Sequence, residues 1–285
     1  MTYLLLAILT SSIIFILFKF FESYRIDIIQ ALTINYLVAT LCGYFSAPER
    51  ITMQQAMDKP WMLYAAISGF LLIATFFVYA ISTQKVGIAI TSVSGKMSVI
   101  IPVLFGFLMF HEVATWMRIA GIMVALLAFY LTLKRTSAQK AQSRFLILPI
   151  LLFVGNGFND SIFNISQELY IKNDFTNYLT VAFFISFCIG IVVLLSSVIV
   201  KKQKVFLRSI IAGVILGLLN WFSTYFFLVG MSLFDVSVFV PVFNVSIVTI
   251  SALVGTIFYK EKLSTINIIG IVLAIVSIVL IAGWA

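Results

Sequence analysis

Long apolar runs alternate with short polar stretches along the whole chain. An α-helix of roughly 20 apolar residues crosses a hydrocarbon layer about 30 Å thick, and runs of that length recur throughout. The polar interruptions are mostly short and contain charged or turn-forming residues. The pattern predicts ten membrane-spanning helices, at about residues 3–21, 28–46, 61–83, 88–110, 114–133, 145–167, 176–200, 209–231, 236–258 and 264–284. The predicted fold class is therefore an all-α membrane protein.

A triplet of glycine, glutamate and glycine occurs twice among these predicted helices. The two triplets have identical spacing and lie 149 residues apart: Gly106, Glu112 and Gly121, then Gly255, Glu261 and Gly270. Residues 86–131 align with 235–280 without a gap and agree at eleven of 46 positions. Eight of the eleven matches are Val, Ile, Leu or Ala, which apolar helices also share by chance. The three matches within the triplets favour an internal repeat, and we read these six residues as a structural repeat motif.

The repeat predicts how the chain is divided. A first repeat covers 1–134, a basic linker covers 135–144, and a second repeat covers 145–285. Five spans in each half bring the second half into the membrane from the opposite side, so the repeats are inverted. The expected architecture is ten transmembrane helices as two inverted five-helix repeats, with a binding site where the repeats meet.

The composition excludes several classes of protein. Of the 285 residues 62% are hydrophobic and 10% are charged, which is more apolar surface than a soluble domain of this size can bury. The lysines and arginines that give the net charge of +8 lie mostly in short loops between apolar runs. We therefore expect a lipid bilayer and no nucleic acid as partner. Cys42 and Cys188 lie inside apolar runs and are interpreted as buried thiols. The sequence contains no Gly-rich phosphate loop, catalytic triad or metal-ligand spacing, so we predict no enzyme activity, cofactor or metal.

The basic residues also predict an orientation. On one side of the predicted spans lie 13 of the 18 lysines and arginines: Lys19, Arg25, Lys85, Lys134, Arg135, Lys140, Arg144, Lys201, Lys202, Lys204, Arg208, Lys260 and Lys262. The loops on the other side hold Arg50, Lys59 and Lys172. The positive-inside rule places the first side in the cytoplasm and both termini outside.

Two stretches of sequence carry a family resemblance. They are PVLFGFLMFHE, which ends at Glu112, and GTIFYKE, which ends at Glu261, each followed nine residues later by a glycine. With these motifs the chain resembles the drug/metabolite transporter superfamily, specifically its ten-helix EamA-type transporters. The resemblance implies a basket in which helices 1, 3, 4, 6, 8 and 9 surround a central cavity while helices 5 and 10 brace the outside. Members of the superfamily move amino acids, nucleotide sugars, sugar phosphates, choline-like cations and drugs.

The chain departs from this family pattern in two ways. Ser251 stands where the repeat would place a counterpart of Pro102, so a kink in that helix is expected at Pro241 instead. Family members usually have cytoplasmic termini, whereas the charge distribution predicts termini outside. We keep the prediction from charge because its bias is large.

Two ionisable residues lie deep within predicted spans and are the first candidates for a site. Lys96 lies about eight residues inside the fourth span, and Asp160 lies well inside the sixth. A charge at such depth costs about 2.5–3.5 kcal/mol on insertion scales, so each side chain should face water, a substrate or a partner rather than lipid. The alternative is a mutual ion pair that only fixes helix packing.

Polar and aromatic residues on the spans expected to line the cavity extend this candidate site. Asn156 and Asp160 share one helical face, and Trp221 and Tyr225 share another, because residues four apart lie one above the other. The full substrate-binding prediction comprises Lys96, Asp160, Asn156, Asn159, Trp221, Tyr225, Tyr79, Asn220 and Asn244. The alternative for the aromatic residues is ordinary packing between helices.

Glu112 and Glu261 have two interpretations. Each begins a predicted helix, the fifth and the tenth span respectively, where a carboxylate can accept free backbone N–H groups at the positive end of the helix dipole. They would then be structural caps at the membrane edge, which we favour. The alternative is that they are coupling carboxylates.

Taken together, the sequence predicts a secondary active transporter of the bacterial plasma (inner) membrane that works by alternating access. The expected substrate is a small polar metabolite, with an amino acid as the first choice, export as the first direction, and protons as a candidate coupling ion. One alternative is a transporter of organic cations such as choline-like amines or drugs, held by Asp160 and aromatic rings. Another is a membrane scaffold or receptor that transports nothing. The oligomeric state is expected to be a monomer or homodimer.

Overall fold

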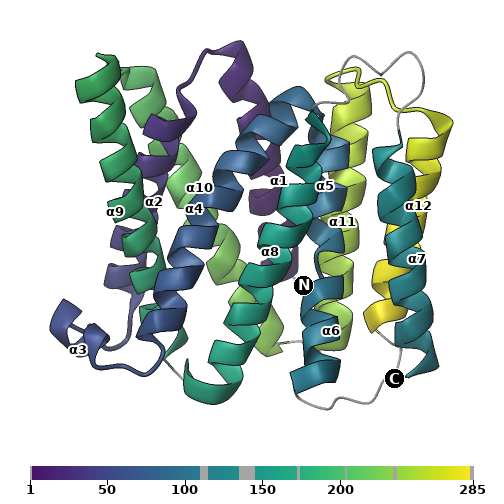
Figure 1. Cartoon of the computed structure of the whole chain (residues 1–285), viewed down its shortest axis with the longest axis horizontal. Helices are drawn as coiled ribbons and strands as arrows, with labels where there is room; N and C mark the ends of the chain where they lie inside the picture. The colour runs from purple at the N-terminus through teal and green to yellow at the C-terminus, as the bar shows by residue number, and fades with distance from the viewer. Residues whose placement is uncertain are drawn as a thin grey trace. The chain divides into compact units, whose positions relative to one another are not determined.

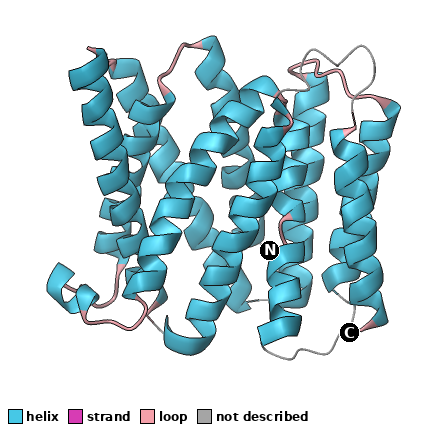
Figure 2. Ribbon diagram, in the orientation of Figure 1, coloured by secondary structure: helices cyan, strands magenta, loops and turns pink. Residues whose placement is uncertain are grey.

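The computed structural model describes residues 2–109, 115–134, 145–171, 174–202, 204–233 and 236–282. Within these ranges the regular secondary structure is entirely helical, as Figures 1 and 2 show. The helices are α1 (Thr2–Ser23), α2 (Ile28–Ser46), α3 (Met53–Met57), α4 (Met62–Lys85), α5 (Ile88–Met97), α6 (Ile100–Met109), α7 (Trp116–Leu133), α8 (Ile147–Ser166), the π-helix η2 (Gln167–Ile171), α9 (Phe175–Lys201), α10 (Leu207–Leu233), α11 (Val236–Ile257) and α12 (Thr265–Ala282).

Within the described ranges, eight helical segments are long and apolar enough to cross a membrane. They are Thr2–Ser23, Ile28–Ser46, Met62–Lys85, Ile88–Leu108, Trp116–Leu133, Phe175–Val200, Leu207–Gly230 and Phe239–Ile257, and a shorter apolar helix covers Thr265–Ile281. α8 has 20 residues, but its three asparagines and Asp160 lower its hydropathy. The chain is thus an all-α, multi-pass membrane protein. The ten-span arrangement as two inverted repeats, with its division at the 135–144 linker, stays a prediction.

The predicted span at 88–110 is not one continuous helix. α5 ends at Met97 and α6 begins at Ile100. Pro102 has no N–H with which to reach the Ser98 carbonyl four residues earlier, and the N–H of Ile101 bonds that carbonyl instead, at 2.9 Å. The Ser98 hydroxyl donates to the Gly95 carbonyl at 2.6 Å, which further competes with regular helix bonding. These local features break the span in its middle, whereas α11 continues through Pro241.

The chain forms two compact units, each assembled from separated segments. Unit 1 comprises Met1–Lys19, Val78–Gly157 and Phe222–Ala285, and unit 2 comprises Phe20–Phe77 and Phe158–Trp221. Each unit therefore takes helices from both halves of the sequence. Its core is built between segments that are far apart along the chain.

In unit 1, α5 packs on α11 and α7 packs on α12. Gly121 of α7 lies so close to α12 that a Cβ there would be 2.8 Å from the Ile281 nitrogen. Gly270 of α12 lies equally close to α7, with a Cβ position 2.5 Å from the Thr132 nitrogen. Thr132 and Ile281 are themselves 149 residues apart, so the two contacts are reciprocal and the helices are antiparallel. A two-fold relation between two copies of one element produces this pattern of contacts.

In unit 2, α2 packs along α9. The buried Gln30 of α2 ties this helix to the segment before α10, because its side chain donates to the Lys204 carbonyl at 2.8 Å and accepts from the Phe206 N–H at 2.9 Å. The Asp27 N–H donates to the Ser209 hydroxyl at 3.0 Å. These hydrogen bonds at the start of α2 thus hold the helix in place within unit 2.

Candidate functional site

Lys96 lies at the break within the fourth predicted span. It is in the last turn of α5, is half-buried, and places its ammonium nitrogen 4.7 Å from the centre of the Phe243 ring on α11. The carbonyl end of a helix is electrically negative, and the face of an aromatic ring attracts a cation. Both features stabilise a positive charge inside a membrane-spanning segment.

Tyr79 and Asn156 meet beside this lysine in unit 1. The side-chain amide of Asn156 on α8 donates to the hydroxyl of Tyr79 on α4. The Tyr79 ring lies against Gly95, where a Cβ would be 2.7 Å from the ring carbon that bears the hydroxyl. Because Gly95 directly precedes Lys96, the structure brings three predicted site residues together: Tyr79, Lys96 and Asn156.

The sequence did not identify two aromatic residues of this group. Phe243 supplies the ring beneath the Lys96 ammonium, and Phe15 of α1 meets the Tyr79 ring edge-on at 5.5 Å between centres. The predicted residue Asn244 follows Phe243 on α11 and is half-buried. The chain holds 28 phenylalanines, and no local pattern marks these two. The sequence repeat gave the only signal. Its 149-residue shift pairs Asn244, which follows Phe243, with Gly95, which precedes Lys96.

The remaining predicted residues are divided between the two units. Unit 1 also holds Tyr225, which is exposed, and unit 2 holds Asn159, Asp160, Asn220 and Trp221. Trp221 is buried in an apolar cluster with Tyr36, Ala39 and Phe183, as expected of a packing residue. The side-chain amide of Asn220 donates to the Asn35 side-chain oxygen at 3.3 Å across α10 and α2.

Polar atoms without partners are present within unit 2. Among the described residues, the Asn159 Oδ1, Asn35 Nδ2 and Tyr36 hydroxyl atoms are buried without a hydrogen-bond partner. Such atoms normally bind water or a ligand, because an unpaired buried polar group is costly. Asp160 follows Asn159 on α8 and is exposed on the surface of that helix. The expectation that Asp160 faces a solvated interior stays a prediction.

Glu261 is a cap, but it caps a different helix from the one predicted. It precedes α12, which begins at Thr265 with its own reciprocal cap from Ser264 and Asn267. The Glu261 carboxylate instead accepts from the N–H groups of Ile88 and Ala89, at 2.7 and 3.3 Å, at the start of α5. The prediction was wrong about the partner because the loop after α11 lies against a helix some 173 residues earlier in the sequence.

The environment of Glu261 controls its charge. Burial raises the pKa of this carboxyl group, while the two backbone N–H groups and nearby Lys19 oppose the rise. Gly255, the first residue of the second triplet, leaves room for it, because a Cβ there would lie 2.5 Å from the carboxylate. In the first triplet, Gly106 is buried on α6, and Glu112 lies outside the described residues.

Comparisons with known proteins agree with this picture of a multi-pass membrane protein. The chain is 26% identical to an uncharacterized protein of Haemophilus influenzae over 282 residues, which cover 96% of this chain and 95% of that protein. A protein of known crystal structure aligns with 98% of this chain and 94% of its own length, with a TM-score of 0.62 and 15% identity, which is a similarity of fold. The model of the EamA-like transporter family matches residues 1–134 and 169–283. With both matched segments together spanning most of its length, the chain belongs to the EamA-like transporter family.

Proposed function

We propose that this protein is a secondary active transporter that moves a small zwitterionic or anionic metabolite, with an amino acid as the first candidate and export as the first direction to test. The family makes it a membrane transporter. The observation that carries the choice of substrate is the Lys96 ammonium at the interrupted helix, where it can attract a carboxylate. Interrupted helices expose main-chain groups at mid-membrane depth, and transporters use such helix ends to bind substrates and ions.

Other polar groups of the predicted site suit the rest of such a substrate. Tyr79 and Asn156 offer a hydroxyl and an amide next to the helix that carries Lys96. Asn159 has an acceptor atom without a partner among the described residues, and Asp160 offers a carboxylate for an ammonium group or a proton. We assign Lys96 to the substrate carboxylate and Asp160 to the ammonium or a coupled proton.

Alternating access between two inverted repeats is the mechanism we propose. The reciprocal contacts of Gly121 and Gly270 support a two-fold relation between the helices that carry the triplets. α5 also packs on α11, the helix that the 149-residue shift assigns to it. In this mechanism one repeat rocks against the other, and the binding site opens to each side in turn.

Flux measurements in proteoliposomes test the proposal. Vesicles loaded with labelled amino acids should release them with the wild-type protein, and Lys96→Met and Asp160→Asn should each lower that flux at least tenfold. Lys85→Met serves as the matched control, because Lys85 is exposed in the last turn of α4. Unchanged flux in both variants, with correct insertion of each protein, would remove these residues from the mechanism.

Transport of an organic cation is the second candidate, and the Phe243 ring favours it. This ring already lies beneath one cation, the Lys96 ammonium. A quaternary amine could take the same face of the ring if Lys96 turned away. Choline should then raise the melting temperature of Lys96→Met more than that of the wild type. An amino-acid transporter would show no such gain.

A further inference from the structure

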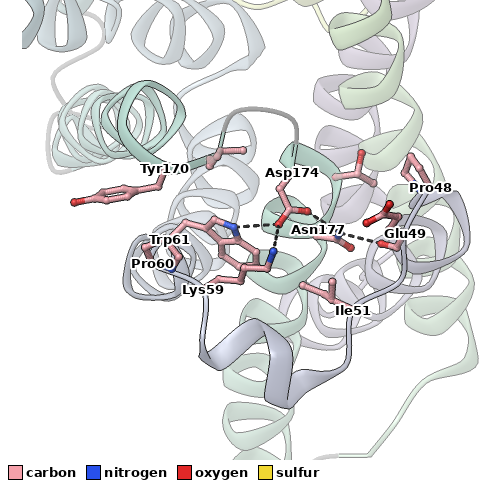
Figure 3. A pocket seen from close by; sticks show the side chains of 11 residues that line it. Pro48, Glu49, Ile51, Lys59, Pro60, Trp61, Tyr170, Asp174 and Asn177 are labelled. Atoms are coloured by element: carbon pink, nitrogen blue, oxygen red, sulfur yellow. Dashed lines mark hydrogen bonds and ion pairs between the residues drawn. The ribbon is translucent and has the colours of Figure 1, made fainter.

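A pocket of about 550 Å³ lies in unit 2, and Lys96 is not among its lining residues. Its walls come from the segment between α2 and α4, from η2 and from the start of α9 (Figure 3). The lining residues are Pro48, Glu49, Ile51, Lys59, Pro60, Trp61, Tyr170, Ile171, Asp174, Thr176 and Asn177. Its size is typical of a site for a small molecule.

Asp174 organises this pocket through three donors. Its Oδ2 atom accepts from the indole N–H of Trp61 at 3.2 Å and pairs with the Lys59 ammonium at 3.3 Å. Its Oδ1 atom accepts from the Asn177 amide at 2.7 Å, and the same amide donates to the Glu49 main-chain oxygen at 3.0 Å. Figure 3 shows these bonds running from Lys59 to Glu49. The network therefore holds the pocket walls in fixed positions.

Two opposite charges at the pocket can still act on a ligand. The Lys59 side chain is 41% exposed, and its ammonium has three donors, so the bond to Asp174 leaves donors for a second partner. Glu49 is exposed and joins the network through its main-chain oxygen, so its carboxylate is not used in that contact. Lys59 and Glu49 thus bring one positive and one negative side chain to the pocket.

The remaining wall is aromatic and has an irregular backbone. Trp61 is held rigid by its bond to Asp174 and by edge-on contact with Tyr178 at 5.9 Å between ring centres. Tyr170 and Ile171 lie in η2, a π-helix of five residues. π-Helices are rare and are frequently found at functional sites, so η2 favours a binding role for this wall.

We infer that this pocket is a second binding site, for a small zwitterion that combines an ammonium group, an anionic group and an apolar or aromatic side chain. The anionic group would bind Lys59, the ammonium would bind Glu49, and the side chain would lie against Ile51 and Pro60, which also line the pocket. A free amino acid has this chemistry. The inference does not rest on the proposed function, because none of the pocket residues belongs to the Lys96 group.

An ethanolamine lipid headgroup presents the same pair of charges, so the test must separate the two sources. We choose the free zwitterion because Ile51, Pro60 and Tyr170 line the pocket and add an apolar binding surface for an amino-acid side chain. Binding of L-phenylalanine to the purified full chain should be measured by titration calorimetry in detergent. Phenethylamine and 3-phenylpropionate, which each lack one charge, should bind at least about tenfold more weakly.

Three variants locate the binding. Glu49→Gln is the cleanest, because it keeps the main-chain bond to Asn177, and it should weaken L-phenylalanine binding about tenfold or more. Lys59→Gln should do the same, and Trp61→Phe should weaken binding less. Asp58→Asn and Lys204→Gln are the charge-matched controls, because both residues are exposed and neither lines the pocket.

Lys96→Met distinguishes this inference from the proposed function. If the pocket binds the zwitterion, Lys96→Met leaves calorimetric binding at the pocket in place even where flux is lost. Binding that survives Glu49→Gln and Lys59→Gln but disappears in Lys96→Met would overturn the pocket assignment and leave the transport proposal standing. Equal binding of the one-charge analogues, or loss of L-phenylalanine binding in nanodiscs of phosphatidylethanolamine but not phosphatidylglycerol, would also overturn it.

Discussion

A lysine in a membrane-spanning segment needs partners for its charge, and Lys96 obtains them from its immediate surroundings. The end of α5 and the Phe243 ring supply negative potential, and Gly95 allows Tyr79 to approach closely. At the scale of single residues, the geometry of the site thus depends on the absence of a side chain at Gly95.

Gly95→Ala should destabilise the protein by about 1–3 kcal/mol, because the new methyl group would overlap the Tyr79 hydroxyl and ring. Adding Tyr79→Phe should recover part of the loss, since it removes the hydroxyl that meets the methyl group. Thermal unfolding of the two single variants and the double variant measures this coupling. Strictly additive effects would contradict the contact.

At this scale the sequence marks residues whose polarity is conspicuous and does not mark those whose polarity is not, and the role of the marked residues in a site stays a prediction. Lys96, Asn156 and Tyr79 stood out because polar groups are rare in apolar runs, and the structure brings them together. Phe243 could not be recognised, because a phenylalanine in a membrane helix is ordinary and its role depends on which helix packs opposite. The charged pocket around Asp174 was missed for a similar reason, since its residues come from separate connections.

At the scale of elements, α5 is a short helix whose two ends are held in different ways. Its start is capped by Glu261 from the loop after α11, and its end carries Lys96 at the break. The break could have been predicted, because Pro102 and Ser98 are both visible in the sequence. The origin of the cap could not, because nothing local connects Glu261 with Ile88.

Protonation of Glu261 should make stability depend on pH. Burial raises the pKa of this group in the folded protein above its unfolded value, so the folded state binds the proton more tightly. Its stabilising contribution is therefore complete below the unfolded pKa and is lost as pH rises through the folded pKa. The melting temperature of the wild type should fall as pH rises across that window. The melting temperature of Glu261→Gln should lack this dependence on pH.

Other charges near Glu261 must be controlled in that experiment. Lys19 faces it, Tyr259, Lys260 and Lys262 lie in the same loop, and burial together with Glu261 raises the pKa of Tyr259. Lys260→Gln is a suitable control, because it removes a charge from the same loop. A pH profile of Glu261→Gln that is identical to the wild-type profile would show that another group titrates.

The contact between α7 and α12 should be equally sensitive from both sides. Gly121→Ala and Gly270→Ala each bring a methyl group against main-chain atoms, which no rotamer change can relieve. Each should cost about 1–3 kcal/mol. Met123→Ala, at an exposed position on α7, is the control. The melting temperatures of the three variants measure this effect. If one glycine tolerated alanine and the other did not, that result would contradict the reciprocal contact.

At the scale of the whole molecule, the packing joins the two halves of the sequence. α2 with α9, α5 with α11, and α7 with α12 each pair a helix before the basic linker with one after it. The apolar pattern was enough to predict an all-α membrane protein. It could not reveal that each compact unit draws on both halves, because hydropathy contains no information about which helices become neighbours.

A chain cut after Lys140 should therefore still assemble when both fragments are produced together. Residues 1–140 and 141–285 produced separately should be degraded or aggregate, since each would expose faces that the other normally covers. Co-purification through a tag on one fragment measures assembly. Stable, monodisperse fragments produced alone would contradict this expectation.

The reciprocal contacts of Gly121 and Gly270 bear on how such a chain could arise. A half-length ancestor inserted in both directions across a bilayer would have made the same contact with its own copy. Gene duplication and fusion would then have required no new interface, only a tether between two subunits that already fitted together. Once fused, the two copies could accumulate different mutations, and a lysine such as Lys96 needed to appear in only one of them.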